Sequence, residues 1–414
     1  MKLGKYSFGI GDRFGHQGPA QLKAIEEVMN QGLTITPVWN KSHREHEIIK
    51  TTPGSVRTEA DDAVNKLGWD DAYFVDADHI TMDTIEDFLV SSNYFTIDVA
   101  DFIGNGIQES DEKTFLEKNG SLIGDMEIPG ISEKFEINES LLKKIAHNYI
   151  NAIKEARRIY QHIKKEKGDD VVIEISMDEV EKPQTPVELF FILKTLSEYD
   201  VQINTIAPKF TGRFNKGVDY VGDLDKFSQE FEQDILVIKH VISDYHLPED
   251  LKLSVHSGSD KFSIYDSIHN IIKQHDSGLH VKTSGTTWLE ELIGLASADN
   301  DGLQMVQSIY KTAWSRFKEL TDPYAPVIDV DYEGLPTPDT FNSWESKKVV
   351  AKLTHNPDDP EFDSQLRQFL HCSYKIAAEK KSEYYNLLKK YEKVIGSNVT
   401  NNLYKRHLKP LFLE

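Results

Sequence analysis

Leu251-Lys-Leu-Ser-Val-His-Ser-Gly-Ser259 and Gly278-Leu-His-Val-Lys-Thr-Ser-Gly285 are each predicted to form a strand followed by a loop. Apolar and polar residues alternate in both stretches, so one face of each strand carries polar side chains, among them His256, His280 and Lys282. Buried parallel strands are normally apolar on both faces. The polar faces therefore indicate that these two strands border a functional site.

Six further β-rich runs precede these two, and stretches long enough for a helix separate most of them. Thr185-Pro186, for example, is a typical cap and first-turn proline for a helix over 187–199. Strands that alternate with helices pair in parallel, because each return crosses over the sheet. The eight predicted strands are 5–11, 33–39, 72–76, 94–99, 171–177, 201–207, 251–256 and 279–283.

Eight such units predict a closed (β/α)₈ barrel, with a doubly wound open sheet as the main alternative. Every run offers polar residues on one face, such as Thr96/Asp98 and Glu174/Ser176. A barrel directs all eight polar faces towards one interior, whereas an open sheet has no common place for them. We therefore expect the barrel.

The regular spacing breaks between the fourth and fifth runs, where 101–170 is about twice the usual crossover length. We expect an inserted subdomain there. A proline-rich stretch after position 321 leads into a helical tail. The predicted organisation is a catalytic barrel over 1–320, which includes the insertion, and a C-terminal helical extension over 321–414.

Composition limits the partners of the chain. Its 414 residues contain 47 Lys and Arg against 68 Asp and Glu, a net charge of −21, which argues against nucleic acid or an anionic membrane as the main partner. The single cysteine, Cys372, cannot form an internal disulfide, and the first residues lack the apolar run of a secretory signal. We expect a cytoplasmic protein without a membrane span, and homo-oligomer formation is left open.

Residues just after the strands are the stronger candidates for a functional site, because barrel enzymes place their catalytic residues there. Asp76-Ala-Asp78-His79 ends the third run and offers carboxylates and an imidazole for acid–base or metal chemistry, or a cap for the next helix. Asp178 and Glu179 follow the fifth run. His43-Arg-Glu-His46, in contrast, is predicted to be an exposed helical turn.

The last strands add histidines and cations. His256 leaves its strand into a tight turn and is a good candidate metal ligand, whereas His280 lies deeper and has a structural role as its alternative. Lys209 and Lys282 are cations at strand ends that could hold a substrate carboxylate or pair with neighbouring acids. Arg13 and His16 are weaker candidates of the same kind.

Taken together, several blocks resemble the tagaturonate/fructuronate epimerase family. The blocks are Asp76–His79, Ser176–Glu179, Ile206–Gly212, Ser254–Gly258, His280–Gly285 and Asn402–His407. The resemblance implies a divalent-metal-dependent epimerase of hexuronate catabolism that interconverts D-tagaturonate and D-fructuronate with Zn, Mn, Ni or Co as its metal.

The resemblance also implies roles for individual residues. Asp78 would be the proton acceptor and Glu179 the proton donor, with Asp178 as an alternative donor. His79, His256 and His280 would be the metal ligands. The strand-end cations Lys209 and Lys282, singled out from the sequence itself, are the candidate anchors for the substrate.

The two uronates differ at a carbinol carbon β to the ketone, so simple enolisation cannot invert it. A retro-aldol route can, and it needs a metal, two acid–base groups and a carboxylate anchor.

Two alternatives to the epimerase are left open by the sequence. One is a metal-dependent sugar isomerase or aldolase on the same barrel, and the other is a non-catalytic sugar-acid binding protein.

Overall fold

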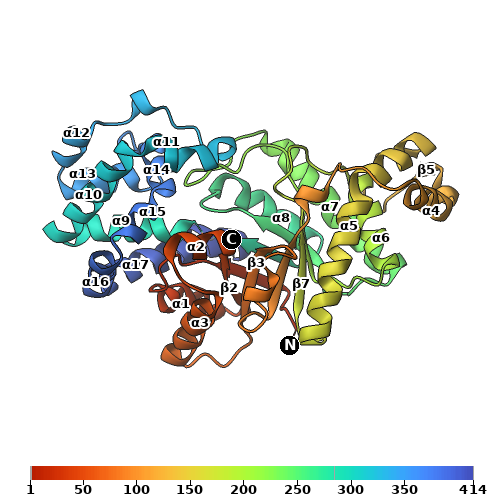
Figure 1. The fold of residues 1–414 in the computed structure, drawn as a ribbon, viewed down its shortest axis with the longest axis horizontal. Helices are drawn as coiled ribbons and strands as arrows, with labels where there is room; N and C mark the ends of the chain where they lie inside the picture. Colours follow the sequence, from red (N-terminus) through yellow and green to blue (C-terminus); the bar gives the residue numbers. More distant parts are fainter. Residues whose placement is uncertain (1, 284, 414) are drawn as a thin grey trace.

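The computed structural model describes residues 2–283 and 285–413, so Ser284, the last polar residue of the second opening stretch, lies outside the described residues. Eight parallel strands close into a barrel in the order β1-β10-β9-β8-β7-β4-β3-β2 (Figure 1). The predicted (β/α)₈ fold is thus confirmed. The strands are β1 (Tyr6–Ile10), β2 (Thr36–Ser42), β3 (Phe74–Ile80), β4 (Tyr94–Asp98), β7 (Val172–Ser176), β8 (Thr205–Ala207), β9 (Lys252–His256) and β10 (Leu279–Lys282).

Helices connect the strands and cover the outside of the barrel (Figure 1). Local signals set their ends: the Thr185 side chain accepts a hydrogen bond from the Glu188 N–H, and the Glu188 side chain accepts one from the Thr185 N–H. The connecting helices are α1 (Gly18–Met29), α2 (His43–Ile49), α3 (Pro53–Leu67), α5 (Glu139–Lys167), α6 (Pro186–Glu198), α7 (Leu224–Tyr245), α8 (Tyr265–Gln274) and α9 (Thr286–Ala298). Short 3₁₀ turns are η1 (Ile85–Asp87), η2 (Ala100–Phe102), η3 (Gly120–Leu122) and η4 (Phe262–Ile264).

The barrel interior is polar, as the strand alternation predicts. Between the neighbouring strands β1 and β10, the Ser7 hydroxyl lies 2.9 Å from His280 Nδ1, and between β4 and β7 the Tyr94 hydroxyl donates to Glu174 over 2.8 Å. Apolar residues of the same strands, such as Phe8, face the helices and belong to the main hydrophobic core. The barrel is therefore held from outside by apolar packing, while its interior is free to carry charged and hydrogen-bonding groups.

The long connection between β4 and β7 contains a small added unit. Helix α4 (Glu109–Asn119) and the antiparallel hairpin of β5 (Gly124–Met126) and β6 (Phe135–Ile137) lie at one end of the molecule, far from the C-terminal helices (Figure 1). Helix α5 then contacts β4 and α6, as the crossover helix of a barrel unit does. Part of the 101–170 stretch is thus insertion and part is barrel.

The chain after α9 forms a helical extension on the other side of the barrel (Figure 1). Helix α9 contacts α10, α13 and α17, and the last turns of the chain return to α1 and α8. The extension is therefore attached to the barrel through α9 and through the last turns of the chain. Its elements are α10 (Asn300–Ser315), α11 (Phe317–Thr321), η5 (Asp322–Val327), η6 (Tyr332–Gly334), α12 (Pro338–Asn342), α13 (Ser346–Leu353), α14 (Ser364–Cys372), α15 (Tyr374–Glu379), α16 (Lys381–Lys390), α17 (Glu392–Asn402), the π-helical η7 (Leu403–Leu408) and α18 (Lys409–Phe412).

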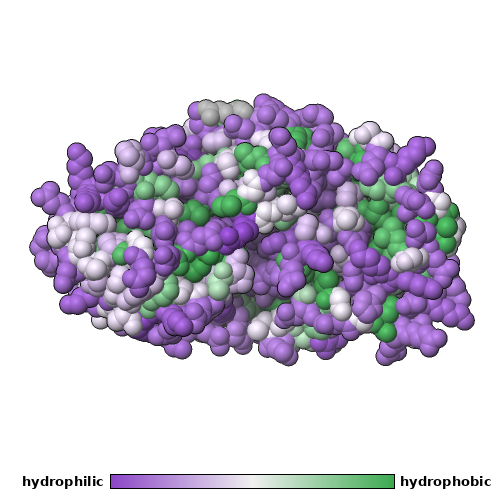
Figure 2. All heavy atoms as spheres, turned by 90° about the horizontal axis from the view of Figure 1, so that it is seen from above, coloured by the Kyte–Doolittle hydropathy of each residue, from purple (hydrophilic) through white to green (hydrophobic). Residues whose placement is uncertain are grey.

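The surface is mostly hydrophilic. Figure 2 shows small, separate hydrophobic patches on one face, and the large apolar side chains most open to solvent, such as Val90 and Ile123, come from unrelated elements. In the described part of the chain, no helix combines the length and the apolar character needed to cross a membrane.

Candidate active site

The carboxyl ends of the barrel strands open into a cavity of about 400 Å³, a size typical of small-molecule sites. Its walls come from the segments that follow the strands and from the C-terminal extension. Seven of the site candidates singled out in the sequence line it: Arg13, Asp78, His79, Asp178, Glu179, His256 and Lys282.

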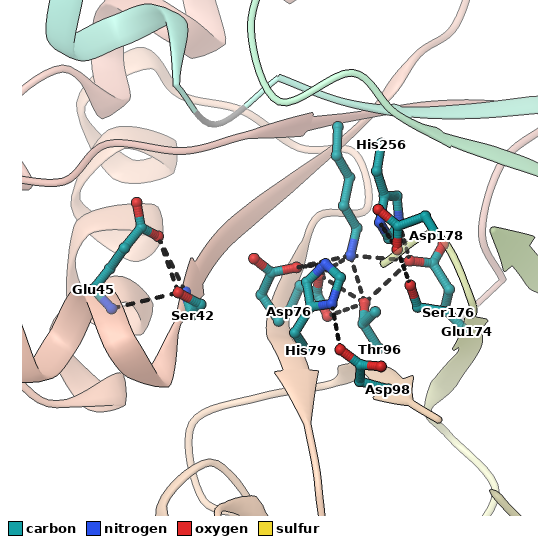
Figure 3. Close-up of polar contacts among 12 residues, drawn as sticks. Ser42, Glu45, Asp76, His79, Thr96, Asp98, Glu174, Ser176, Asp178 and His256 are labelled. Atoms are coloured by element: carbon teal, nitrogen blue, oxygen red, sulfur yellow. Dashed lines mark hydrogen bonds and ion pairs between the residues drawn. The ribbon is translucent and has the colours of Figure 1, made fainter. Parts of the chain in front are cut away.

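Two histidines and one carboxylate meet at the cavity floor (Figure 3). One ligand-type atom each from His79, Asp178 and His256 lies within 4.8 Å of the others, and among the described residues these three form the one group of this kind. The two imidazole rings stand edge to face with centroids 5.1 Å apart. Three protein donors that leave a position free match the ligand count of catalytic divalent-metal sites.

A carboxylate orients each imidazole of this group. Asp98 lies 3.0 Å from His79 Nδ1, and Glu174 lies 2.8 Å from His256 Nε2. The free nitrogen of His256, Nδ1, lies 3.2 Å from Asp178. Metal-ligating histidines almost always have their second nitrogen held in this way. The donor set therefore fits a divalent cation with His79 Nε2, His256 Nδ1 and Asp178 as ligands.

The same carboxylates control the charge of the imidazoles. Burial alone would lower the pKa of His256, but Asp178 and Glu174 outweigh it and raise this pKa to about 9. Neighbouring carboxylates likewise raise the pKa of His79 well above its ordinary value against the effect of burial. Protons thus compete with a metal for this group, and binding of a cation would release them.

The backbone at His79 is unusual. The β3–β4 register shifts between Ala77 and Ile80, and His79 has a φ of +53° in the middle of this irregularity. Positive φ is uncommon for a residue other than glycine and costs about 1–3 kcal/mol. The bulge lets Asp78 and His79, neighbours that would face opposite sides of a regular strand, both line the cavity.

Lys282 is surrounded by acids. Its Nζ lies 2.7 Å from Asp76, 3.0 Å from Asp78 and 2.9 Å from Glu174, and it also donates to Thr96. Burial raises the pKa of Asp76 to about 7, although the nearby Lys282 acts in the opposite direction. Burial would also raise the pKa of Asp78, but Lys282 and the two nearby imidazoles bring it below its ordinary value. Asp78 is thus an ionised carboxylate, as a proton acceptor must be.

The remaining predicted residues are not members of the group of His79, Asp178 and His256. His280 is completely buried in the barrel interior beside Ser7 and Tyr94, and burial lowers its pKa to about 3. Lys209 lines a smaller adjoining cavity of about 40 Å³ together with Asp178 and His256. Glu179 is exposed at the rim of the main cavity. The structure thus brings Asp178, and not His280, to the two histidines.

Sequence reasoning missed several residues that line the cavity. The segment 43–46 is a helical turn at the start of α2, as predicted, and Arg44 is exposed, but His43 and Glu45 are half-buried at the cavity and His46 is buried. The predicted exposure therefore holds for only part of the turn. Asp98 was noted only as part of a polar strand face. Its position at the carboxyl end of β4 was the available signal. Lys216, from the segment after β8, was not singled out at all.

A closed barrel with carboxylates, imidazoles and cations around a small polar cavity defines a (β/α)₈ enzyme that acts on a small polar molecule. A family model described as tagaturonate epimerase matches residues 1–411. The chain belongs to the tagaturonate epimerase family and is a carbohydrate epimerase, an isomerase.

Individual relatives agree with this assignment. The tagaturonate/fructuronate epimerase of Thermotoga maritima is 29% identical to the chain over an alignment 420 residues long, and this alignment covers 97% of this chain and 80% of the relative. Two glycerol-complexed crystal structures of the fructuronate-tagaturonate epimerase of Cohnella laeviribosi superpose with TM-scores of 0.81 and 0.82 at 23% and 24% identity. These alignments cover 98% and 100% of this chain and 81% and 83% of those chains, and they show that the fold is shared.

Proposed function

We propose that this protein interconverts D-tagaturonate and D-fructuronate by a retro-aldol and aldol sequence that depends on a divalent metal. The observation that carries the proposal is the grouping of His79, Asp178 and His256 within 4.8 Å at the floor of the cavity, next to the ionised Asp78. When bound there, a divalent cation such as Zn, Mn, Ni or Co supplies positive charge for the oxygens of the substrate.

The protein residues supply the proton transfers. Asp78 accepts the proton of the hydroxyl on the carbinol carbon, and the bond from this carbon to its neighbour on the ketone side breaks to give an aldehyde and an enolate. The aldehyde turns over, and the bond forms again on its other face. Glu179, exposed at the cavity rim, is the proposed donor of the proton that the carbinol oxygen takes up when the bond has formed again. Asp178 is less suited to this role, because it already contacts His256.

The roles of two predicted site residues, His280 and Lys209, stay predictions. His280 stays a predicted ligand, although it lies outside the group of three, and its buried Nε2 has no hydrogen-bond partner in the described structure. Lys209 stays a predicted anchor. For Lys282 we propose a different role. Three carboxylates already balance its charge, so it keeps Asp78 ionised.

The activity test uses metal-stripped protein. After removal of metal with a chelator, D-tagaturonate should stay unchanged, and addition of Zn²⁺, Mn²⁺, Ni²⁺ or Co²⁺ should produce D-fructuronate. A different product would support a sugar isomerase or aldolase, and binding without turnover would support a sugar-acid binding protein. Deuterium from the solvent at the inverted carbon would exclude the retro-aldol route.

The role of Asp78 has a matched control. Asp78→Asn should lower kcat about 10²- to 10⁴-fold, because a general base is lost while the shape of the side chain is kept. Asp83→Asn, an exposed position five residues further along the chain, should leave kcat unchanged. Equal kcat values for the two variants would exclude Asp78 as the base.

We also propose that residues 1–320 form the catalytic domain, which includes the barrel, its insertion, α10 and most of α11, and that 321–414 form the C-terminal extension proper. Tyr324, His371 and Tyr374 of the extension line the cavity, which supports a direct part for the extension in the site.

A further inference from the structure

The cavity has a basic side that the proposed proton transfers do not use. Arg13, Arg44, Lys216 and His371 all line it. Arg13 follows β1, Lys216 follows β8 and His371 lies in α14, near the loops after β9 and β10. In the barrel, β8, β9, β10 and β1 are consecutive neighbours, while most carboxylates of the site come from β3, β4 and β7 or the segment just after β7. Glu45 of α2 is the exception and pairs with Arg13.

Hydrogen-bonding groups on this basic side are unused. Arg13 is only 7% exposed, its Nε donates to Glu45, and its Nη1 is buried without a partner. His371 is 1% exposed, and both of its ring nitrogens lack a partner within 2–283 and 285–413. Lys216 forms no ion pair with a carboxylate in the described residues. Buried donors rarely stay unpaired, so an acceptor beyond the described residues is expected here, and a bound anion would supply one.

Lys216 and His371 lie close to the loops that follow the last two barrel strands. A Cβ atom added to Gly258, after β9, would lie 3.5 Å from Lys216 Nζ. A Cβ added to Gly285, after β10, would lie 2.4 Å from His371 Nε2. (β/α)₈ barrels frequently bind the anionic group of a substrate at the loops after their seventh and eighth strands.

His371 is a neutral hydrogen-bond donor and adds no positive charge to this side of the cavity. Burial, together with the nearby Arg13 and Lys216, lowers its pKa well below the ordinary value. A neutral imidazole still donates one N–H, while Lys216 and Arg13 supply positive charge. Lys282 is less suited to an anion, because three carboxylates surround it. Arg13 and Arg44 both stack on tyrosine rings, 4.3 Å from Tyr374 and 4.6 Å from Tyr324, but Arg44 is exposed, whereas Arg13 has a buried guanidinium nitrogen without a partner among the described residues.

We propose that Lys216, Arg13 and His371 form the subsite that binds the carboxylate of the sugar acid, so that the C-terminal extension contributes a specificity-determining residue. The inference rests on the proposed function. In the retro-aldol step the carboxylate belongs to the aldehyde fragment. A fixed carboxylate lets this fragment turn over in place without leaving the cavity.

The test compares an acid with its neutral counterpart on the metal-loaded protein. The equilibrated mixture of D-tagaturonate and D-fructuronate is titrated by calorimetry, and so is D-tagatose, which carries a hydroxymethyl group in place of the carboxylate. Lys216→Met should weaken binding of the uronates about 10- to 100-fold, the loss expected for a charge-assisted hydrogen bond, and should raise KM more than it lowers kcat. Its effect on D-tagatose should stay within about twofold, because the neutral sugar makes no such bond.

Two further variants separate charge from structure. Lys216→Arg should restore most of the uronate affinity, and Lys347→Met, which removes an exposed charge from α13, should change neither ligand. Equal losses for the acid and the neutral sugar in Lys216→Met, or an acid-specific loss in Lys209→Met instead, would overturn the assignment. Failure of the proposed function is a separate result: the unmodified protein would then convert no D-tagaturonate, whatever the titrations show.

Discussion

Replacement of Asp98 by asparagine tests the proposed metal site without removing a ligand. The Asp98 carboxylate lies 3.0 Å from His79 Nδ1 and fixes the imidazole so that its other nitrogen faces Asp178 and His256. Asparagine keeps the shape but loses the charge. Loss of a carboxylate behind a ligating histidine typically weakens metal binding about 10- to 100-fold, or roughly 1.4–2.7 kcal/mol.

The measurement is a competition titration in which a coloured chelator and the protein share Zn²⁺ or Mn²⁺. Asp98→Asn should bind the metal more weakly by this factor, and its activity should recover when the metal concentration is raised. Recovery at high metal concentration shows that the chemical step itself is intact, because Asp98 acts only through His79.

Asp101→Asn is the matched control, since Asp101 is exposed three residues further along the chain. It should bind the metal like the unmodified protein. Unchanged metal affinity in Asp98→Asn, or the same loss in both variants, would refute the proposed orientation of His79. A lower melting temperature of the apoprotein in Asp98→Asn alone would instead assign Asp98 to folding.

Three other predictions concern stability. Asp260→Asn should lower the free energy of unfolding in urea by about 3–5 kcal/mol, because the buried Arg367, 2.8 Å from Asp260, would lose its charge partner; an effect under about 1 kcal/mol would contradict this. Burial raises the pKa of Glu290 to about 7, so the folded protein holds a proton that the unfolded chain releases, and the stability this contributes below about pH 4.5 is lost as the pH rises to 7. Glu290→Gln should therefore stabilise the protein at pH 8 by up to about 3 kcal/mol and have little effect at pH 5, and the reverse order in urea titrations would be inconsistent with it. Gly285→Ala should lower the melting temperature, with a cost of about 1–3 kcal/mol, because its Cβ would lie 2.4 Å from the carbonyl oxygen of Gly258; an unchanged melting temperature would show that the loops can move apart.

Local patterns account for how much of the fold could be predicted. Alternation of apolar and polar residues with a period of two revealed the strands. Because every second residue of a strand faces the same side, the alternation also predicted polar side chains inside the barrel, as the contact between Ser7 and His280 shows. Strand ends were less accurate. β3 continues to Ile80, four residues beyond its predicted end, because a bulge at His79 keeps it paired with β4. Such a bulge depends on the neighbouring strand and not on the local sequence.

The candidate site could be predicted only in part for a similar reason. Position after a strand was enough to single out Asp78, His79 and His256, which all line the cavity. It could not tell Asp178, which contacts His256, from its neighbour Glu179 at the rim. Nor could it show that Lys282 is already paired with acids from other strands.

The sequence by itself determined the barrel, its polar interior and the chemical types at its mouth, because alternation and strand ends are properties of short segments. Only the tertiary structure decided which of these side chains meet. It joins His79 and His256 to Asp178, and it brings His371, from the C-terminal extension, to the cavity beside Lys216. Proximity across more than a hundred residues comes from the packing of the extension on the barrel, which no local spacing records.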